Sequence, residues 1–307
     1  MIIDVLVPAT RASMAVKCLL SLAGQQRRPD TVVVIMQRRD TKTQEAVQDF
    51  IKRGSLNVAA VLVEAPGIID ATNAGLKVCC GDIICFIDDD ARAKKDWIQR
   101  IEAYYADEKI GGVGGRDIVY FGDKIDEKPV KKVGQVTWCG RVIGNHHHIV
   151  KMPKRVTHLK GCNMSYRRKL LFPLDKNLKT QIEMPEPEWE LDIGLSISMR
   201  GYKIIYDPNI LVEHYPASST YNRNMRKSIS VRNQTYVLLK HFPLCRKIIY
   251  IIFAFLIGQR SRPGILQFII ELLSLKGAET SWLELVASLK DKSKGFKVYT
   301  KSLNDAR

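Results

Sequence analysis

The sequence lacks the patterns that define several large classes of protein. Its seven cysteines are odd in number and include no C-x-x-C pair, which argues against a zinc site or a disulfide framework and fits a reducing compartment. No G-x-G-x-x-G follows the first predicted strand and no G-x-x-x-x-G-K-[ST] occurs, so dinucleotide-dependent dehydrogenases and P-loop nucleotidases are disfavoured. Repeats and low-complexity tracts are missing too. With 46% hydrophobic residues, the chain is instead expected to fold around a substantial core.

Targeting signals and long apolar runs are also missing. The first residues, MIIDVLVPATR, have neither the basic start nor the apolar stretch of a signal peptide, so we expect a cytoplasmic protein. Residues 248–258 are uncharged and residues 264–275 hold one charge, Glu271. A bilayer span takes about 20 apolar residues, so neither run is long enough to cross a membrane alone.

Positive charge is concentrated near the end of the chain. Residues 223–301 hold fifteen Lys and Arg against four Asp and Glu, and such a segment prefers polyanions. Aliphatic runs without exposed aromatic platforms disfavour nucleic acid as the partner. Apolar helices flanked by Arg246, Lys247, Arg260 and Arg262 suit a peripheral element on the anionic inner face of the cell membrane. Packing of these helices on the protein core explains the same runs, so both interpretations stay open.

Strands and helices alternate along the first half of the chain. Strand-like apolar runs occupy residues 2–8, 31–36, 58–63 and 83–87, and residues 13–25, 41–52 and 71–79 have helical spacing. This alternation predicts an α/β fold, a mainly parallel sheet flanked by helices.

The second half is less regular. Its first glycine-rich stretch, GGVGG at 111–115, is expected to break the chain, and residues 109–160 are expected to form short strands and loops. A helix over 192–199 and short strands over 202–206 and 210–212 should follow. From residue 223 onward the pattern predicts helices, interrupted at Pro243 and Pro263.

Polar residues follow three of the predicted strands. Pro8–Arg11 follow the first, Asp70–Gly75 come after the third, and Asp88-Asp89-Asp90 end the fourth. Ligands of open α/β sheets bind at the carboxyl ends of the strands. In an extended chain Asp88 and Asp90 share a face, and crowded carboxylates favour a hard divalent cation. The alternative is that Asp88 or Asp89 caps a helix that begins near Ala93.

These motifs resemble those of family 2 glycosyltransferases of the GT-A fold, most closely the bacterial enzymes of cell-surface polysaccharide synthesis. The resemblance extends over residues 2–233, about three quarters of the chain. It rests on six motifs in the expected order: Pro8-Ala9-Thr10, Pro66-Gly67 with Asn73-Ala74-Gly75-Leu76, Phe86-Ile87-Asp88-Asp89-Asp90, Gly161-Cys162-Asn163, Glu190-Leu191-Asp192, and Asp207-Pro208 with His214. The stretch from Gly140 to His147 is similar as well.

The resemblance implies a metal and donor site. It assigns the metal, Mn²⁺ or Mg²⁺, to Asp90 and His214, and it lets Asp88 contact either the metal or the nucleotide ribose. Two departures stand out: Asp40 is shifted from the usual base-binding aspartate, and Thr72 replaces an arginine that contacts phosphate in many relatives. Arg11, Arg223, Arg226 or Arg232 would then supply that contact. The positions implied for the nucleotide sugar are Pro8, Thr10, Arg11, Asp40, Asn73, Asp88, Asp89 and Arg232.

The resemblance also implies a catalytic base and an acceptor side. Glu190 matches the family's general base, with Asp192 as the alternative, because a sugar hydroxyl needs a carboxylate to take its proton. The acceptor positions implied are Trp138, Trp189, Gly161 and Asn163, although core packing explains both tryptophans equally well. His146–His148 lack carboxylate or cysteine partners for zinc, which favours an acceptor-side or surface role.

The sequence therefore predicts a metal-dependent, inverting glycosyltransferase. It would move a sugar from a nucleoside diphosphate, most often UDP, to a glycan or lipid-linked acceptor. We expect residues 1–115 to bind the donor, 116–222 the acceptor, and 223–307 to form a helical extension. Two alternatives are a non-catalytic carbohydrate- or lipid-binding module on the same fold and a sugar nucleotidyltransferase. The latter usually has a glycine-rich basic loop where this chain has Pro8–Arg11.

Overall fold

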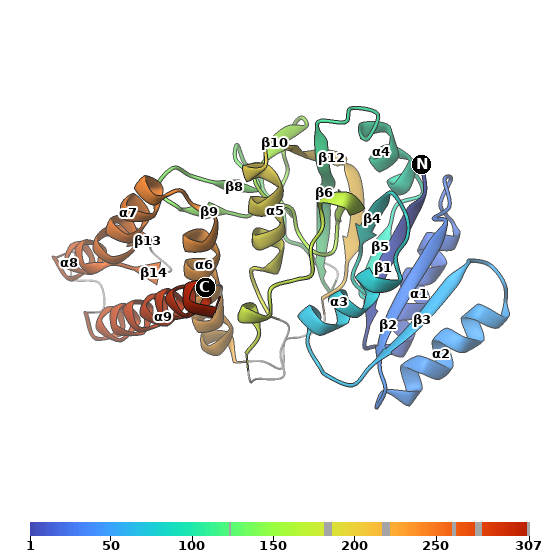
Figure 1. The fold of residues 1–307 in the computed structure, drawn as a ribbon, viewed down its shortest axis with the longest axis horizontal. Coiled ribbons are helices and arrows are strands. Elements are labelled where there is room, and N and C mark those ends of the chain that lie inside the picture. The colour runs from blue at the N-terminus through green and yellow to red at the C-terminus, as the bar shows by residue number, and fades with distance from the viewer. Residues whose placement is uncertain (123, 181–185, 217–221, 260–261, 274–277, 306–307) are drawn as a thin grey trace.

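A ten-stranded mixed sheet runs through the protein (Figure 1). The computed structural model describes residues 1–307 except 123, 181–185, 217–221, 260–261, 274–277 and 306–307. The main strand order is β10-β12-β6-β11-β4-β1-β2-β3, and the pairs β1–β2, β1–β4, β2–β3 and β6–β12 are parallel. The strands of this path are β1 (Ile3–Ala9), β2 (Thr31–Gln37), β3 (Val58–Val63), β4 (Ile83–Phe86), β6 (Ile110–Phe121), β10 (Lys154–Val156), β11 (Met164–Arg167) and β12 (Lys203–His214).

Helices cover both faces of this sheet, as the alternating pattern predicts. Side chains alternate along β1, so Val5 and Val7 enter one buried cluster with α1 and α4 while Leu6 enters a second cluster with α3, α5 and α6. The predicted α/β class is thereby confirmed. The helices are α1 (Ala12–Ala23), α2 (Thr41–Lys52), α3 (Ile68–Val78), α4 (Trp97–Tyr104), α5 (Trp189–Met199) and α6 (Arg223–His241).

The glycine-rich stretch does not break the chain, contrary to expectation. It forms the first half of β6, in the middle of the sheet. A Cβ at Gly112 would lie 2.6 Å from the ring of Tyr166, and one at Gly115 would overlap the carbonyl oxygen of Ile210. The neighbouring strands approach so closely that only glycine fits, and β12 has a register irregularity between Asp207 and Leu211 at this point.

Three further expectations need correction. No helix begins near Ala93: β5 (Ala91–Ala93) pairs with β12 there, and α4 begins at Trp97. The two short strands expected after residue 202 are one strand, β12, continued through its irregularity. The C-terminal region is not wholly helical, because a hairpin of β13 (Gly258–Gln259) and β14 (Arg262–Pro263) interrupts it. Backbone pairing across these segments has no signature in local periodicity.

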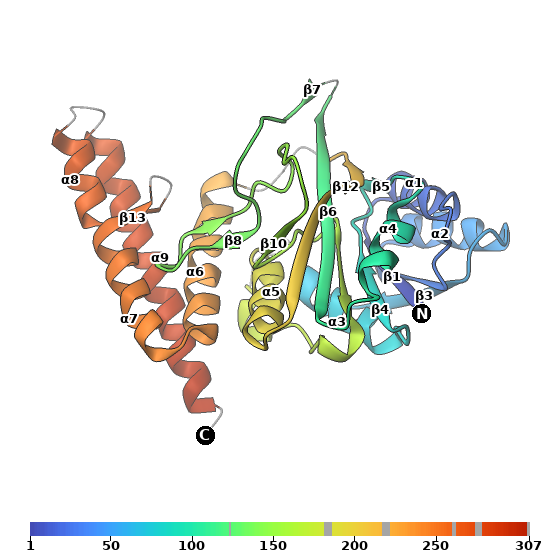
Figure 2. The same ribbon diagram turned by 90° about the horizontal axis from the view of Figure 1, so that it is seen from above.

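The last helices lie together at one end of the molecule in both views (Figures 1 and 2). They are α7 (Leu244–Ile252), the π-helical turn η3 (Phe253–Ile257), α8 (Ile265–Leu273) and α9 (Ala278–Asp305), with α6 between them and the sheet. Within the described part of the chain, no helix combines the length and the apolar character that crossing a bilayer requires.

Candidate active site

The loops after β1 and β4 are joined through Asp89. Its Oδ2 accepts hydrogen bonds from the backbone N–H groups of Thr10 and Arg11, at 2.7 and 3.0 Å. The Arg11 guanidinium contacts Asp89 and also lies 2.9 Å from Oδ2 of Asp90. Asp89 and Arg11 therefore fix the two loops to each other. Both side chains already have protein partners in this structure.

Asp88, Asp90 and His214 form a group whose geometry suits a divalent metal ion. One ligand atom from each lies within 4.8 Å of the others, and His214 Nε2 is 3.3 Å from Oδ1 of Asp90. Burial and the neighbouring Asp90 carboxylate raise the pKa of Asp88 to about 6. Such crowded negative charge is what a bound cation relieves, and two carboxylates with one imidazole are suitable ligands for Mn²⁺. The residues therefore fit a metal ion.

Two charged residues behind this group were missed at the level of sequence. Asp117, on β6, is 0% exposed, and its Oδ2 lies 3.8 Å from His214 Nδ1 and 3.1 Å from the Lys160 ammonium. Burial acts to raise the pKa of Asp117, but Lys160 and His214 hold it well below the usual range. A lone carboxylate on an apolar strand is the signal that could have indicated Asp117. Its contacts come from residues far along the chain.

Lys160 begins a tight turn that faces α5. Asn163 closes the turn: its backbone N–H donates to the Lys160 carbonyl at 2.9 Å, and its side-chain amide donates to the Ile210 carbonyl at 3.0 Å. A Cβ at Gly161 would lie 3.2 Å from Oε1 of Glu190 and 3.0 Å from the ring of Trp189. The turn thus rests directly against the first residues of α5, with no room for a larger side chain at Gly161.

Glu190 lies in the first turn of α5, beside this turn. Burial raises the pKa of Glu190 to about 7, the Glu188 and Asp88 carboxylates act in the same direction, and Lys160 acts against them. A carboxylate with a pKa near the working pH can accept a proton and release it again. Glu190 therefore has the properties of a general base, close enough to Asp88 for the two carboxylates to interact.

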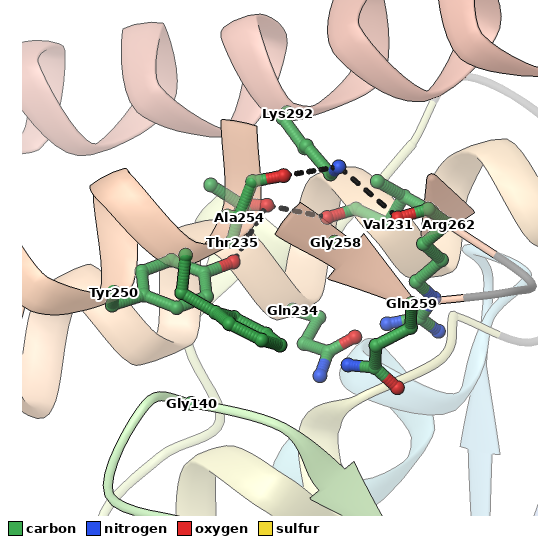
Figure 3. Close-up of a pocket in the computed structure, with 11 residues that line it drawn as sticks. Gly140, Val231, Gln234, Thr235, Tyr250, Ala254, Gly258, Gln259, Arg262 and Lys292 are labelled. Carbon is green, nitrogen blue, oxygen red and sulfur yellow. Dashed lines mark hydrogen bonds between the residues drawn. The ribbon is translucent and has the colours of Figure 1, made fainter. Parts of the chain in front are cut away.

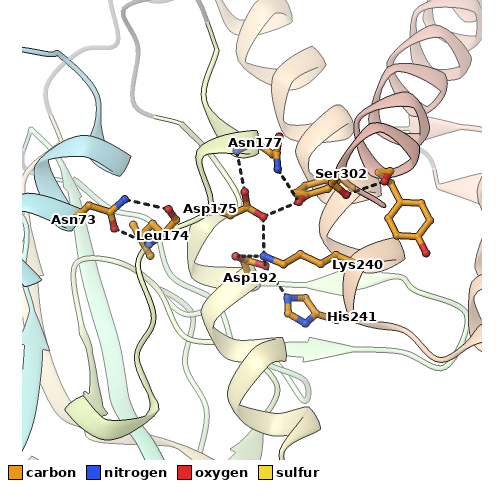
Figure 4. A network of polar contacts seen from close by, with 10 residues as sticks. Asn73, Leu174, Asp175, Asn177, Asp192, Lys240, His241 and Ser302 are labelled. Atoms are coloured by element: carbon orange, nitrogen blue, oxygen red, sulfur yellow. Dashed lines mark hydrogen bonds and ion pairs between the residues drawn. The ribbon is translucent and has the colours of Figure 1, made fainter. Parts of the chain in front are cut away.

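Asp192, the alternative base, belongs to a separate polar network (Figure 4). Its carboxylate lies 2.6 Å from His241 Nε2 and 3.0 Å from Lys240 Nζ, and Lys240 also pairs with Asp175 at 2.8 Å. This network ties α5 to α6. Residues two apart on a helix point in different directions, which explains why Glu190 and Asp192 have different surroundings.

Several residues predicted to bind the donor make contacts within the fold, and their donor role stays a prediction. The Asn73 side chain exchanges two hydrogen bonds with the backbone of Leu174, at 2.6 and 3.0 Å (Figure 4). Asp40 caps α2, where its side chain accepts from the Thr43 N–H at 3.1 Å. Arg232 lies in α6 and donates to the Asn233 side chain. Pro8 lies within β1. Thr10 faces Asp89 through its backbone.

The residues predicted to bind the acceptor lie in different parts of the structure: some are close to Glu190, and one is at the hairpin over residues 135–143. Trp189 is buried against Phe86, so core packing accounts for it. Asn163 is buried and its amide is engaged, including as acceptor from Trp97 Nε1 at 2.9 Å, so it supports the turn. Trp138 is 63% exposed between β8 (Gln135–Val136) and β9 (Val142–Ile143), where it lies beside Arg246 of α7. Gly161 alone contacts Glu190.

Of the two roles expected for the histidine tract, acceptor-side or surface, burial excludes the surface role for two of its members, and the acceptor-side role stays a prediction. His146 and His148 are buried, and the His146 Nε2 contacts the His158 carbonyl at 3.1 Å. Asp126 supplies the carboxylate neighbour that sequence reasoning did not find, with its Oδ2 3.6 Å from His147 Nε2. Asp126 and His147 are 21 residues apart in the sequence, so a search for closely spaced ligands does not find the pair.

Comparison with known proteins agrees with this arrangement. A sequence model described as glycosyl transferase family 2 matches residues 4–172, more than half of the chain. The chain belongs to glycosyl transferase family 2. It is therefore a glycosyltransferase, and the family predicted from its motifs is confirmed. No curated protein matches the chain.

Solved glycosyltransferase structures share the fold of this family 2 member. Residues 1–349 of S. aureus TarS, in complex with UDP-GlcNAc, are 18% identical with a TM-score of 0.64, and the match covers 96% of this chain and 81% of that 1–349 chain. The mannosyltransferase PcManGT from Pyrobaculum calidifontis, in complex with GDP-Man and Mn²⁺, is 18% identical with a TM-score of 0.59. The match covers 99% of this chain and 88% of the PcManGT chain. GalNAc-T7 with UDP, GalNAc and Mn²⁺ is 16% identical with a TM-score of 0.62, covering 77% of this chain but about half, 48%, of its own. The predicted GT-A fold is confirmed.

Proposed function

We propose that this family 2 member catalyses metal-dependent, inverting transfer of a sugar from a nucleoside diphosphate to an acceptor hydroxyl. The observation that carries the proposal is the position of one carboxylate of raised pKa, Glu190, next to the turn that separates it from Asp88, Asp90 and His214. The structures of TarS with UDP-GlcNAc and of PcManGT with GDP-Man support a nucleotide-sugar donor. UDP is our first choice of nucleotide.

Asp88, Asp90 and His214 would hold Mn²⁺ or Mg²⁺ in this proposal. When bound there, the ion would neutralise the diphosphate of the donor and stabilise it as a leaving group. The Mn²⁺ present with PcManGT and GalNAc-T7 supports this choice of cofactor. Asp89 and Arg11 would keep the two loops around the diphosphate in place.

Glu190 would take the proton from the acceptor hydroxyl as that oxygen attacks the anomeric carbon of the donor sugar. The bond to the diphosphate breaks on the opposite side, so the configuration inverts. Asp192 is engaged by Lys240 and His241, which leaves a single base on this helix. A retaining double displacement would require a second carboxylate as nucleophile.

Lys160 would replace the phosphate contact that Thr72 cannot make. Arg11 is paired with two carboxylates, Asp89 and Asp90, whereas the Lys160 ammonium is paired with one, Asp117 at 3.1 Å, and acts against the rise in the pKa of both Asp88 and Glu190. It therefore lies between the proposed metal ligands and the proposed base. An ammonium at this place favours the diphosphate over a neutral ligand.

The acceptor we propose is a hydroxyl of a glycan or lipid-linked glycan used in cell-surface polysaccharide or glycolipid synthesis, with the enzyme peripheral to the cytoplasmic membrane. In this scheme residues 1–115 bind the donor and residues 116–222 shape the acceptor side. The support is the resemblance of the motifs to enzymes of that kind, together with the composition of residues 223–307.

Thermal unfolding with Mn²⁺ or Mg²⁺ against UDP, GDP, dTDP and CMP tests the donor site. A nucleotide present at 100 times its Kd adds about 2.7 kcal/mol to the free energy of unfolding, which shifts the melting temperature measurably. We expect one nucleotide to stabilise the protein only when metal is present, and Asp90→Ala to abolish the shift. If no nucleotide stabilises the protein but glycans do, a non-catalytic binding module replaces the proposed enzyme.

A further inference from the structure

The C-terminal helices expose an unusual share of the apolar surface. Among the described residues, sixteen of the twenty-nine large hydrophobic side chains that are exposed lie between Leu244 and Leu303, a fifth of the chain. Single exposed apolar residues are normal on any protein, but a concentration of this kind marks a surface that contacts something other than water.

These side chains follow the outer faces of the helices. Leu244, Ile248 and Ile252 are spaced by four along α7, so they lie on one face of that helix. The other two helices contribute most of the remainder: Ile265, Leu266, Ile269, Ile270, Leu272 and Leu273 on α8, and Trp282, Leu283 and Val286 on α9. We name the exposed apolar residues of α7, η3, α8 and α9 the C-terminal apolar surface.

Basic side chains adjoin this surface. Lys290, Lys294, Lys297 and Lys301 are exposed and recur at helical spacing along the second half of α9, directly after the apolar residues of its first half. Residues 223–301 carry fifteen Lys and Arg and only four Asp and Glu. This combination of aliphatic and basic side chains matches a surface that enters the headgroup region of a membrane and pairs with its negative charge.

Trp138, from another part of the chain, is exposed next to the same group of helices. The carbonyls of Thr137 and Trp138 accept hydrogen bonds from the Arg246 guanidinium at 2.9 and 3.2 Å, which fixes the β8–β9 hairpin to α7. The exposed indole therefore lies beside Arg246, which is two residues from both Leu244 and Ile248 and so points to a different side of α7 from their apolar face. Tryptophan is enriched at the membrane–water interface, where its ring is buried in the headgroup layer and its N–H stays hydrated.

We propose that the C-terminal apolar surface docks on an anionic phospholipid bilayer without spanning it. A second copy of the chain is the less suitable occupant, because it would bring the same excess of positive charge against this one. The helices are also held to the rest of the protein from within. Lys292 of α9 donates to the carbonyls of Ala254, Pro263 and Arg262, at 2.6, 2.9 and 3.2 Å, and closes a small hollow against α6 (Figure 3). The hollow lies between α6 and the C-terminal helices, so it does not involve the outer faces that would contact the lipid.

Sedimentation of the full chain with vesicles tests the proposal, without donor or acceptor present. We expect binding to phosphatidylcholine vesicles that contain about one third phosphatidylglycerol, weaker binding to pure phosphatidylcholine, and a fall in affinity with rising salt. Ile270→Glu and Leu283→Glu should each lower the affinity at least about tenfold. Leu20→Glu is the matched control, because Leu20 is similarly exposed on α1 and should bind as the wild type does.

Three results would overturn the proposal: no binding to the anionic vesicles at low salt, variants that bind as tightly as the wild type, or a dimer that the same substitutions dissociate while vesicles are ignored. Both variants should keep the wild-type melting temperature and the nucleotide-dependent stabilisation. A loss of vesicle binding alone therefore concerns this surface, and a loss of nucleotide stabilisation alone concerns the proposed function.

Discussion

Replacing Glu190 by Gln should stabilise the protein at alkaline pH while it destroys activity. Glu190 lies against the turn that contains Gly161. Burial raises its pKa to about 7 from an ordinary value near 4.5, and the Glu188 and Asp88 carboxylates act in the same direction. The folded protein therefore binds this proton more tightly than the unfolded chain does. Ionising Glu190 in the folded state costs free energy, and glutamine, which does not ionise, avoids that cost.

The size and the pH window of the effect follow from the two pKa values. Below pH 4.5 both states are protonated and the substitution changes little. Between pH 4.5 and about 7 the unfolded chain loses its proton first, so the penalty grows, and above pH 7 it is constant. The difference between the values corresponds to about 3 kcal/mol, an upper limit because the side chain can relax toward water. Urea denaturation at pH 5 and pH 8.5, in chelator, measures it.

Asp192→Asn supplies a matched control on the same helix with the opposite sign. Asp192 pairs with Lys240 at 3.0 Å and contacts His241 at 2.6 Å, so neutralising it leaves Asp175 as the remaining carboxylate partner of Lys240 and weakens the contact with His241, which should lower the free energy of unfolding by about 1–3 kcal/mol at pH 8.5. Glu190→Gln should keep donor binding while kcat falls by about 10²–10⁴. A Glu190→Gln protein that is no more stable at pH 8.5 than at pH 5, relative to wild type, would refute the reasoning.

Two further substitutions test the surroundings of the base. Lys160→Met should weaken metal-dependent nucleotide binding by roughly tenfold to a hundredfold, measured by calorimetry, because a charge-assisted contact to phosphate is lost. The same change should move the acidic limb of the kcat/KM profile to higher pH, since Lys160 lowers the pKa of Glu190; unaltered binding and an unaltered limb would count against its proposed role. Arg262→Met should lower kcat several-fold with unchanged nucleotide affinity, because Arg262 lies 3.5 Å from Glu188 and donates to Ser230 at 2.6 Å. Equal kcat in wild type and variant would show that this contact does not position the base.

The first half of the fold could be predicted because its patterns are local. The predicted bounds of 41–52 and 58–63 agree with α2 and β3 at both ends, and the other early elements differ by a few residues. The prediction that residues 111–115 interrupt regular structure was wrong, because it rested on the usual effect of glycine on helices and strands. Here its small size serves the close approach of Asn163 and Ile210 across the sheet. That requirement is set by tertiary packing.

The residues of the candidate site also differ in whether local sequence could predict them. Asp88 and Asp90 were predictable, because the carboxyl ends of parallel strands meet at one edge and these residues end a buried strand. Asp117 and Lys160 were not, since their pairing depends on β6 lying beside the 160–163 turn. The distinction between Glu190 and Asp192 also needed the structure, because only their neighbours on other elements separate them.

The C-terminal region also holds the start of α5, the helix that carries the proposed base. Glu188, which precedes α5, has a φ of +75°, a conformation that costs a non-glycine residue about 1–2 kcal/mol. Ser230 of α6 and Arg262 of the β13–β14 hairpin contact its carboxylate, and Lys292 binds the carbonyl of Arg262 in turn. Removing residues 244–307 would therefore disturb Glu190 as well as the apolar surface. Substitution of single exposed side chains is the test that separates membrane docking from the geometry of the base.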